Sequence, residues 1–265
     1  MSYRDKKYEF MIVTVDEDGI AIIQHNRPDA LNAIHAPLNL EKNEIYKEVI
    51  ADPGVKVVIT TGNDRAFCAG GDLKAFANYG VKDARLFIDR SRESSFLLQN
   101  MAKPTIAMVA GICMGGGLEN VLAHDLKIAA DNAKFALPEI NVGIFPGAGA
   151  TQRLPQLMSL SKAKELVFLG ETFDAQTALD LGIVNKVVPL ADLKEETMKL
   201  ARKLASKPLF SLRLAKEALN AAWNCSADQG TIIETHGWSM CYGTKDQKEG
   251  MQAFIEKRKP VFKGE

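Results

Sequence analysis

The order of apolar and polar positions along the chain predicts an α/β protein. Residues 10–15 and 19–24 are short apolar runs on either side of a turn, which is typical of a β-hairpin. Residues 55–61 and 105–109 are β-branched or apolar throughout, as expected of buried strands. Alternation of such strands with helical segments favours a parallel sheet built from β–α units.

Helical spacing of apolar residues recurs through the rest of the chain and becomes dominant after about residue 190. The predicted helices are 38–50, 84–101, 118–126, 161–169, 175–181, 191–206, 208–222, 228–242 and 246–258, with further strands at 126–130 and 183–188. We therefore expect an α/β core over residues 1–190 and a helical C-terminal region over residues 191–265.

Composition places the chain among ordinary globular proteins, with 46% hydrophobic and 25% charged residues in 265. The 33 basic and 33 acidic residues balance, so no net field favours nucleic acid or an anionic membrane. Apolar runs stay below the length that spans a bilayer, and the charged first ten residues lack an apolar signal core. These features predict a cytoplasmic protein with no membrane partner.

Residue types that often mark metal, redox or nucleotide sites do not form such sites here. Cysteines and histidines show no paired metal-ligand spacing, and phosphate-loop and dinucleotide-binding motifs are absent, so we predict no metal and no redox cofactor. Cys68 and His124 are interpreted as packing residues and Asp125 as a structural partner. The helix that carries Lys42 and Lys47 also carries three glutamates, which predicts a solvated charged face.

Candidate chemistry gathers around three consecutive glycines, residues 115–117, that lead into a predicted helix. Glycines let backbone approach a ligand closely, and the first turn of a helix presents unpaired N–H groups to an anion. Glu119 lies in that turn, and Glu139 follows Pro138 twenty residues later. Close packing alone would also explain the glycines, but two carboxylates beside backbone donors favour acid–base chemistry on a carbonyl compound.

Six motifs in order along the chain resemble those of the enoyl-CoA hydratase/isomerase (crotonase) family. They are NRPDALNA (26–33), AFCAGGDLK (66–74), GGGLE (115–119), LPEINVGIFPGAGATQRL (137–154), GIVNKVV (182–188) and EGMQAFIEKRKPVF (249–262). The resemblance implies a crotonase-like spiral of β–β–α units with a helical C-terminal trimerisation region. It also implies a homotrimer or a homohexamer built as a dimer of trimers, and an acyl-CoA thioester substrate, so that coenzyme A is part of the substrate and no separate cofactor is needed.

The same resemblance implies roles for individual residues of the site. The N–H groups of Gly71 and Gly116 would form an oxyanion hole for the thioester oxygen. Glu119 would deprotonate the water that attacks C3, Glu139 would exchange a proton with C2, and the N–H of Gly147 would help to position the water. Contacts to coenzyme A and substrate are expected from Asp29, Ala30, Leu31, Ala69, Gly71, Asp72, Leu73 and Lys74, and from Phe254 and Lys257 of a neighbouring subunit.

Because family hydratases carry both glutamates, the resemblance favours an enoyl-CoA hydratase, equally able to act as a 3-hydroxyacyl-CoA dehydratase. A Δ3–Δ2 enoyl-CoA isomerase, which often keeps only the second glutamate, is the alternative enzyme. A non-catalytic acyl-CoA or RNA-binding protein is a third possibility, against which the intact carboxylate pair and the balanced charge argue. Asn120, His124 and Ala150 depart from the usual family pattern, which leaves the acyl group open, cyclic and dicarboxylic chains included.

Overall fold

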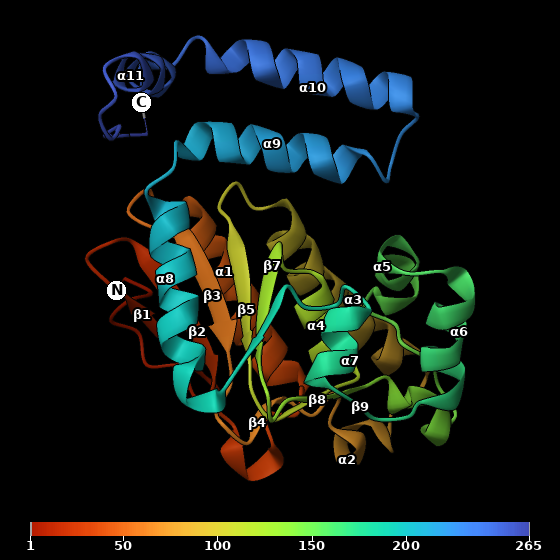
Figure 1. Ribbon diagram of the computed structural model, residues 1–265. Helices are drawn as coiled ribbons and strands as arrows, with labels where there is room; N and C mark the ends of the chain where they lie inside the picture. The colour runs from red at the N-terminus through yellow and green to blue at the C-terminus, as the bar shows by residue number, and fades with distance from the viewer. Residues whose placement is uncertain (1, 265) are drawn as a thin grey trace.

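A six-stranded sheet forms the centre of the molecule, which a computed structural model describes over residues 2–264 (Figure 1). Its strands lie in the order β1 (Met11–Val15), β2 (Ile20–His25), β3 (Val57–Thr61), β5 (Thr105–Val109), β7 (Leu126–Ala130) and β10 (Lys186–Val188). β1 and β2 form the predicted antiparallel hairpin, and all other neighbouring strands are parallel. The predicted parallel sheet is confirmed, with one antiparallel edge strand.

A second, smaller sheet lies at one end of the first. It contains, in order, β4 (Ala66–Cys68), β6 (Ile112–Met114), β8 (Lys134–Ala136) and β9 (Phe173–Asp174). Each of β4, β6 and β8 follows a strand of the large sheet, and a helical segment follows in turn, so the chain winds through three β–β–α turns. This is the spiral that the family resemblance implied. Strands of two or three residues show no period in a sequence, and none of these four was predicted.

Helices cover both faces of the large sheet and line the small one. They are α1 (Ala36–Ala51), α2 (Leu73–Phe76), α3 (Val81–Asn100), α4 (Gly116–Leu122), α5 (Ala150–Leu157), α6 (Leu160–Leu169), α7 (Ala175–Asp180) and α8 (Leu193–Ala205), with short 3₁₀ helices η1 (Pro28–Ala30), η2 (Pro138–Val142) and η3 (Leu190–Asp192). Their bounds lie within a few residues of the predicted ones. α2 and α5 were not predicted. α2 has only four residues, and α5 begins in a stretch rich in glycine and contains Pro155.

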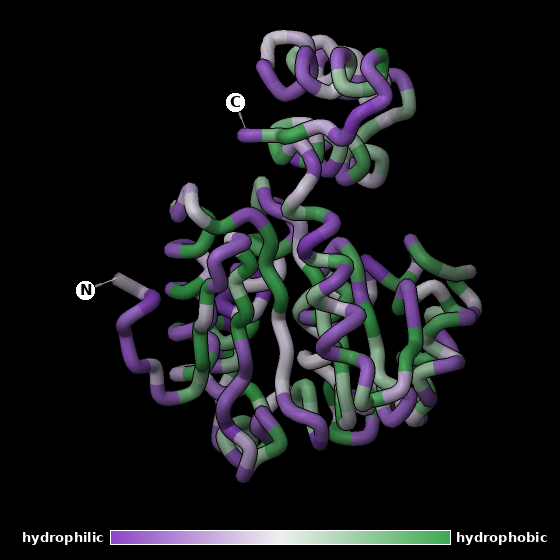
Figure 2. The backbone as a smooth tube through the Cα atoms, turned by 60° about the vertical axis from the view of Figure 1, so that its left-hand side comes forward, coloured by the Kyte–Doolittle hydropathy of each residue, from purple (hydrophilic) through white to green (hydrophobic). Residues whose placement is uncertain are grey.

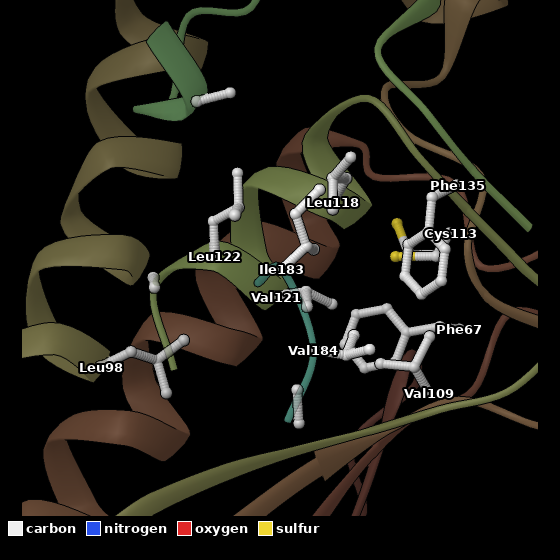
Figure 3. Close-up of a cluster of buried hydrophobic side chains, with 14 of the residues drawn as sticks. Phe67, Leu98, Val109, Cys113, Leu118, Val121, Leu122, Phe135, Ile183 and Val184 are labelled. Atoms are coloured by element: carbon white, nitrogen blue, oxygen red, sulfur yellow. The ribbon is translucent and has the colours of Figure 1, made fainter. Parts of the chain in front are cut away.

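Alternation along β3 separates two apolar cores. Val57 and Ile59 point to the face covered by α8, whereas Val58 points to the opposite face, where α1, α3 and α4 pack. Figure 3 shows part of this second, larger core, where helices meet strands of both sheets: Phe67, Leu98, Val109, Cys113, Leu118, Val121, Leu122, Phe135, Ile183 and Val184. The larger core therefore packs beneath the helix that the glycine triplet begins.

α4 ends at Leu122, so the predicted helix over residues 118–126 is wrong at its C-terminal end. The next two N–H groups bond to carbonyls three residues back, which tightens the last turn. Asp125 then accepts hydrogen bonds from the N–H and the hydroxyl of Thr105, at 2.8 and 3.0 Å. These bonds direct the chain from the helix into β7, and the interpretation of Asp125 as a structural partner is confirmed.

Cys68 and His124 are packing residues, as predicted. Cys68 is fully buried in the larger core. His124 is 3% exposed, and its Nδ1 lies 2.9 Å from the Asn120 carbonyl oxygen one turn earlier. Burial lowers the pKa of His124 to about 3, so the ring is neutral at physiological pH.

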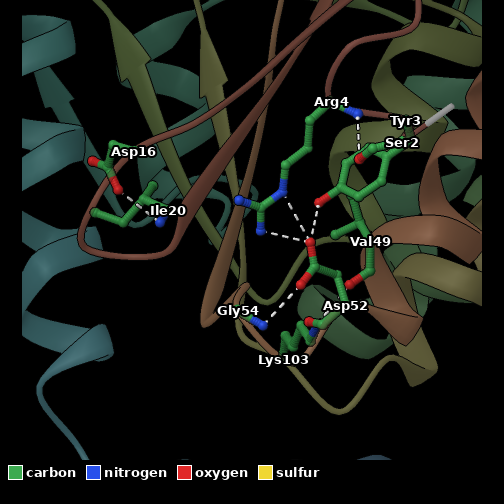
Figure 4. A network of polar contacts seen from close by, with 9 residues as sticks. All are labelled: Ser2, Tyr3, Arg4, Asp16, Ile20, Val49, Asp52, Gly54 and Lys103. Carbon is green, nitrogen blue, oxygen red and sulfur yellow. Dashed lines mark hydrogen bonds and ion pairs between the residues drawn. The ribbon is translucent and has the colours of Figure 1, made fainter.

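The N-terminal segment is tied to the end of α1 through Asp52 (Figure 4). The Asp52 carboxylate accepts hydrogen bonds from the Tyr3 hydroxyl at 2.8 Å, the Arg4 guanidinium at 2.6 Å and the Gly54 N–H at 2.8 Å. Lys103 donates from the other side to the carbonyl of Val49 at 2.6 Å. These contacts satisfy a carbonyl at the helix C-terminus and hold the N-terminal segment against the end of α1.

Three C-terminal helices, α9 (Leu209–Ala221), α10 (Ala227–Cys241) and α11 (Lys245–Ile255), form a layer apart from the sheets in Figures 1 and 2. α8 belongs with the sheet, because Leu193 and Ala201 lie in the smaller core. Within residues 2–264 no helix combines the length and apolarity needed to cross a bilayer.

Candidate active site

A cavity of about 270 Å³ lies between α1, α3 and α4 and the loops that follow β4 and β8. Seven of the residues predicted to form the site line it: Ala69, Gly71, Leu73, Gly116, Glu119, Glu139 and Gly147. They come from three successive turns of the spiral. Residues that are far apart in the sequence thus meet because the parallel turns stack in register.

Gly71 and Gly116 lie side by side at one wall of this cavity. A Cβ added to Gly115 would lie 3.6 Å from the Cα of Gly70, so the two glycine turns are in contact. The Ile34 N–H donates to the Gly70 carbonyl, and the Asp72 N–H donates to the Ile34 carbonyl. Neither bond uses the Gly71 N–H. The Gly116 N–H belongs to the first turn of α4, where no carbonyl of the same helix can accept it.

Gly115 needs to be glycine for two reasons. Its φ of 51° and ψ of −126° lie in a region that other residues rarely adopt. A Cβ there would also lie 2.9 Å from Oε1 of Glu139. The glycine therefore lets the backbone before α4 approach the second carboxyl group.

Glu119 is 3% exposed and is held by the loop after η2. Its Oε1 accepts hydrogen bonds from the N–H groups of Ala148 and Ala150, at 2.7 and 3.1 Å. Burial raises the pKa of Glu119, and these two N–H groups oppose the rise because they favour the charged form. Oε2 has no hydrogen-bond partner within residues 2–264, so one oxygen is fixed and the other is available to a ligand.

Glu139 lies in the first turn of η2 and is half-buried. Burial and, after it, the negative charge of Glu119 raise the pKa of Glu139 to about 7. Its Oε2 is buried without a partner in the described part of the chain. A carboxyl group with a pKa near neutrality can both give and take a proton at physiological pH.

Arg153 supports this arrangement, although the sequence argument assigned it no role. Its guanidinium donates to the Ala148 carbonyl at 3.1 Å and to the Gln99 amide oxygen at 2.9 Å. It thereby ties the loop that holds Glu119 to α3. The sequence feature that could have indicated this role is the position of Arg153 near the end of the motif over residues 137–154, shortly after a run of small residues.

The predicted coenzyme A segments lie next to the cavity but only in part line it. The Ala69 N–H donates to the Leu31 carbonyl at 3.0 Å, which places the loop of Asp29, Ala30 and Leu31 beside the first glycine turn. Asp29 is exposed at the surface of that loop.

Asp72 and Lys74 differ in their surroundings. Asp72 caps α2 and forms an ion pair with Arg27 at 2.7 Å, so it has a structural partner already. Lys74 is exposed on α2. Phe254 is 85% exposed on α11, and Lys257 follows that helix in a left-handed conformation, so both belong to the C-terminal layer.

Lys42 was predicted on a solvated face, and that prediction is wrong. It is 2% exposed and lines the cavity, because α3 packs along the side of α1 on which it lies. Ser95 on α3 and Asn120 on α4 also line it, each 3% exposed. The glutamates that flank Lys42 in the sequence concealed this position, since spacing alone could not assign the charged residues to two faces.

Comparisons with known proteins identify the family of the chain. The profile of the family described as Enoyl-CoA hydratase/isomerase matches residues 16–265. The chain is 40% identical over 252 residues to the crotonyl-CoA hydratase of Syntrophomonas wolfei, which covers 95% of this chain and 97% of that protein. It is also 40% identical to the mitochondrial enoyl-CoA hydratase of Pongo abelii, over 92% of this chain and 83% of that one.

Solved structures give the same result. The crystal structure of an enoyl-CoA hydratase from Bacillus anthracis superposes with a TM-score of 0.93 and is 37% identical, covering 97% of this chain and all of that one. An enoyl-CoA hydratase structure from Geobacillus kaustophilus gives 0.94 at 32% identity, with 98% of each chain covered.

Proposed function

The chain belongs to the enoyl-CoA hydratase/isomerase family, and we propose that Glu119 and Glu139 together carry out its hydratase reaction. The enzyme is a hydro-lyase that adds water reversibly across the 2,3 double bond of a 2-enoyl-CoA. The observation that carries the assignment of residues is the pairing of two carboxyl groups with raised pKa values in one cavity, beside the two glycine turns.

The N–H groups of Gly71 and Gly116 form the oxyanion hole in this proposal. As the nucleophile bonds to C3, electrons of the double bond move toward the thioester carbonyl, whose oxygen gains negative charge. Two preorganised N–H donors stabilise that charge, each typically by roughly 3–4 kcal/mol. The adjacent glycine turns and the free first turn of α4 support this role.

Glu119 acts on the water and Glu139 on the carbon. The free Oε2 of Glu119 accepts a proton from water while the water oxygen bonds to C3. Glu139 in its protonated form gives a proton to C2, and its pKa of about 7 keeps a large protonated fraction at neutral pH. In the reverse direction each glutamate takes the opposite part. Gly147, two residues before the Gly149 that precedes α5, lies beside the loop that holds Glu119 and helps to position the water.

Coenzyme A enters with the substrate, so the proposal includes no separate cofactor. Assembly into a homotrimer, or a homohexamer of two trimers, is proposed for the C-terminal layer. Few of its side chains are buried within the chain, and several large apolar ones are exposed, Trp238 at 64% and Ile255 at 73% among them. In such an assembly Phe254 and Lys257 would reach the coenzyme A of a neighbouring subunit.

Four proteins test the assignment: the unchanged enzyme, Glu119→Gln, Glu139→Gln and the double variant. Each single change keeps the shape of the side chain and should lower kcat for crotonyl-CoA hydration at least ~10²-fold. The double variant should fall far less than the product of the two, because the residues act as one unit. Full hydration by Glu119→Gln, with 3-enoyl-CoA isomerisation lost in Glu139→Gln, would select the isomerase instead.

A further inference from the structure

Three hydrogen-bond donors without partners meet in the same cavity, and the hydration chemistry uses none of them. They are the ammonium group of Lys42 on α1, the hydroxyl of Ser95 on α3 and the amide of Asn120 on α4. Each side chain is at most 3% exposed. Within residues 2–264 Lys42 and Ser95 make no side-chain hydrogen bond or ion pair. Both polar atoms of Asn120 are buried without a hydrogen bond of ordinary length, and the Tyr46 hydroxyl is the protein group that acts on this amide.

Nearby polar groups have partners of their own, except for the Asn39 amide oxygen, which is buried without one. Asn39 donates to Ser91 at 2.8 Å, and the Tyr46 hydroxyl pairs with Thr60 at 3.4 Å. Glu119 is held by the loop of α5 and is not the ion-pair partner of Lys42. The fully buried Cys68 thiol is the titratable neighbour of Lys42, and burial raises the pKa of that thiol to about 11, so it is uncharged at neutral pH.

Such a cluster is costly unless something accepts its hydrogen bonds. An unpaired buried ammonium loses its hydration without compensation, and an unpaired buried amide loses free energy as well. Burial accordingly lowers the pKa of Lys42 to about 8. The cluster offers an ammonium group, an amide and a hydroxyl from three helices. These donors match the several lone pairs of a carboxylate.

We propose that this cluster binds a carboxylate at the far end of the acyl chain, so that the preferred substrate is a 2-enoyl-CoA of a dicarboxylic acid. The inference rests on the proposed hydratase function of the same cavity. Asn120 follows Glu119 on α4, so its side chain points about 100° further around the helix, past the atoms that react. An acyl chain whose thioester lies at Gly71 and Gly116 thus continues from Glu119 toward Asn120 and Lys42.

The activity test uses matched pairs of substrates, in which only the far end of the chain differs. The CoA monothioester of 2-pentenedioic acid is compared with 2-pentenoyl-CoA, and that of 2-hexenedioic acid with 2-hexenoyl-CoA. For the unchanged enzyme, kcat/KM should favour the carboxylate-bearing member of at least one pair by ~10²-fold, the scale of a hydrogen bond to a charged group. Lys42→Met should abolish that ratio, and Lys42→Gln should abolish most of it.

Lys47→Met is the control, because Lys47 lies on the same helix but is exposed and paired with Glu93 at 2.6 Å. It should leave the ratio as it is. Asn120→Leu should lower the ratio ~10-fold. A ratio near one in the unchanged enzyme for both chain lengths, or a ratio that Lys42→Met does not alter, would overturn the proposal.

A binding measurement separates this inference from the hydration chemistry. Saturated thioesters cannot react, so calorimetry with glutaryl-CoA and valeryl-CoA reports recognition alone. Tighter binding of glutaryl-CoA, lost in Lys42→Met, supports the carboxylate site even if no thioester is hydrated. Equal binding of the two, in an enzyme that hydrates crotonyl-CoA, overturns the carboxylate site and leaves the hydratase assignment intact.

Discussion

The spiral core buries its apolar surface within one chain, whereas the C-terminal layer leaves much of its apolar surface exposed. In the core, every residue of β3 and β5 is buried between helices. In the layer, α9 has no buried residue and α10 only Gly237. Large side chains such as Trp223 and Trp238 remain more than half exposed there.

This difference separates chemistry from assembly along the chain. The core is complete as a single chain and holds both glutamates, the glycine pair and the Lys42 cluster. The layer buries too little of its own surface to be explained by contacts within one chain. Polar contacts tie α9 to the core: the Lys216 ammonium group bonds to Asp125 at 2.9 Å, and the Asn220 amide donates to the Gln99 carbonyl at 2.9 Å. Variants of the core should therefore leave association nearly unaffected, whereas variants of the layer should act on association and, through Phe254 and Lys257, on coenzyme A binding. Three changes test this comparison.

The largest expected effect is on catalysis, from Gly116→Pro. Proline is accepted at the first position of a helix, so the fold is retained while the N–H donor is lost. We expect kcat to fall by roughly 10²–10³, with smaller effects on thioester binding and none on subunit association. Stopped-flow hydration of crotonyl-CoA and light scattering measure the two. Unchanged kcat in the folded variant would refute the oxyanion role.

The next effect concerns association, from Trp238→Lys on α10. Trp238 packs against Tyr242 with ring centroids 4.8 Å apart and is otherwise exposed. Placing a charge in a subunit contact should weaken association at least ~30-fold, as for a central tryptophan in an interface. Leu160→Lys, at an exposed apolar position of the core, is the control. Identical sedimentation of both variants and the unchanged protein would contradict the division of roles.

The smallest effect is on stability and stays within the core, from Glu139→Gln. The folded-state pKa of Glu139, about 7, lies above its ordinary value of 4.5, so the folded chain binds more protons between these limits. The stability that Glu139 contributes is therefore present below pH 4.5 and lost as the pH rises through 7. Relative to the unchanged protein, the variant should gain about 1–2 kcal/mol between pH 4.5 and pH 8.

Denaturant unfolding at several pH values measures that gain. Exposed Glu171 supplies the control Glu171→Gln, which should run parallel to the unchanged protein at every pH. A difference between Glu139→Gln and the unchanged protein that does not vary with pH would mean that the carboxyl group titrates normally.

Long elements were predictable because their periodicity is local. The hairpin, β5, β7 and the C-terminal helices lie close to their predicted bounds. β6 could not be found in the same way, since its three residues form a strand only through pairing with β4 and β8. The end of α4 was misplaced because Asp125 turns the chain through bonds to Thr105, a residue twenty positions earlier.

The residues of the site likewise differ in whether the sequence alone could predict them. Short motifs contain Glu119, Glu139, Gly71 and Gly116, and the spacing of these motifs in the sequence already indicates a common site. Lys42 belongs to no motif, and its helix carries charges on several faces. The packing of α3 against α1 makes it a buried residue, so its position required the three-dimensional arrangement.

The winding of the spiral affects how the enzyme folds during its synthesis on the ribosome. Apart from the β1–β2 hairpin, the pairings of the large sheet join segments far apart in the chain, as Val58 with Thr105, so these contacts form late and folding is slow for such a topology. At ~5–20 residues per second, Ala150 leaves the peptidyl-transferase centre roughly 5–20 s after Lys42. Until then the Glu119 carboxylate lacks the N–H groups that hold it. Catalytic turnover by a nascent chain would accordingly report that the spiral has closed.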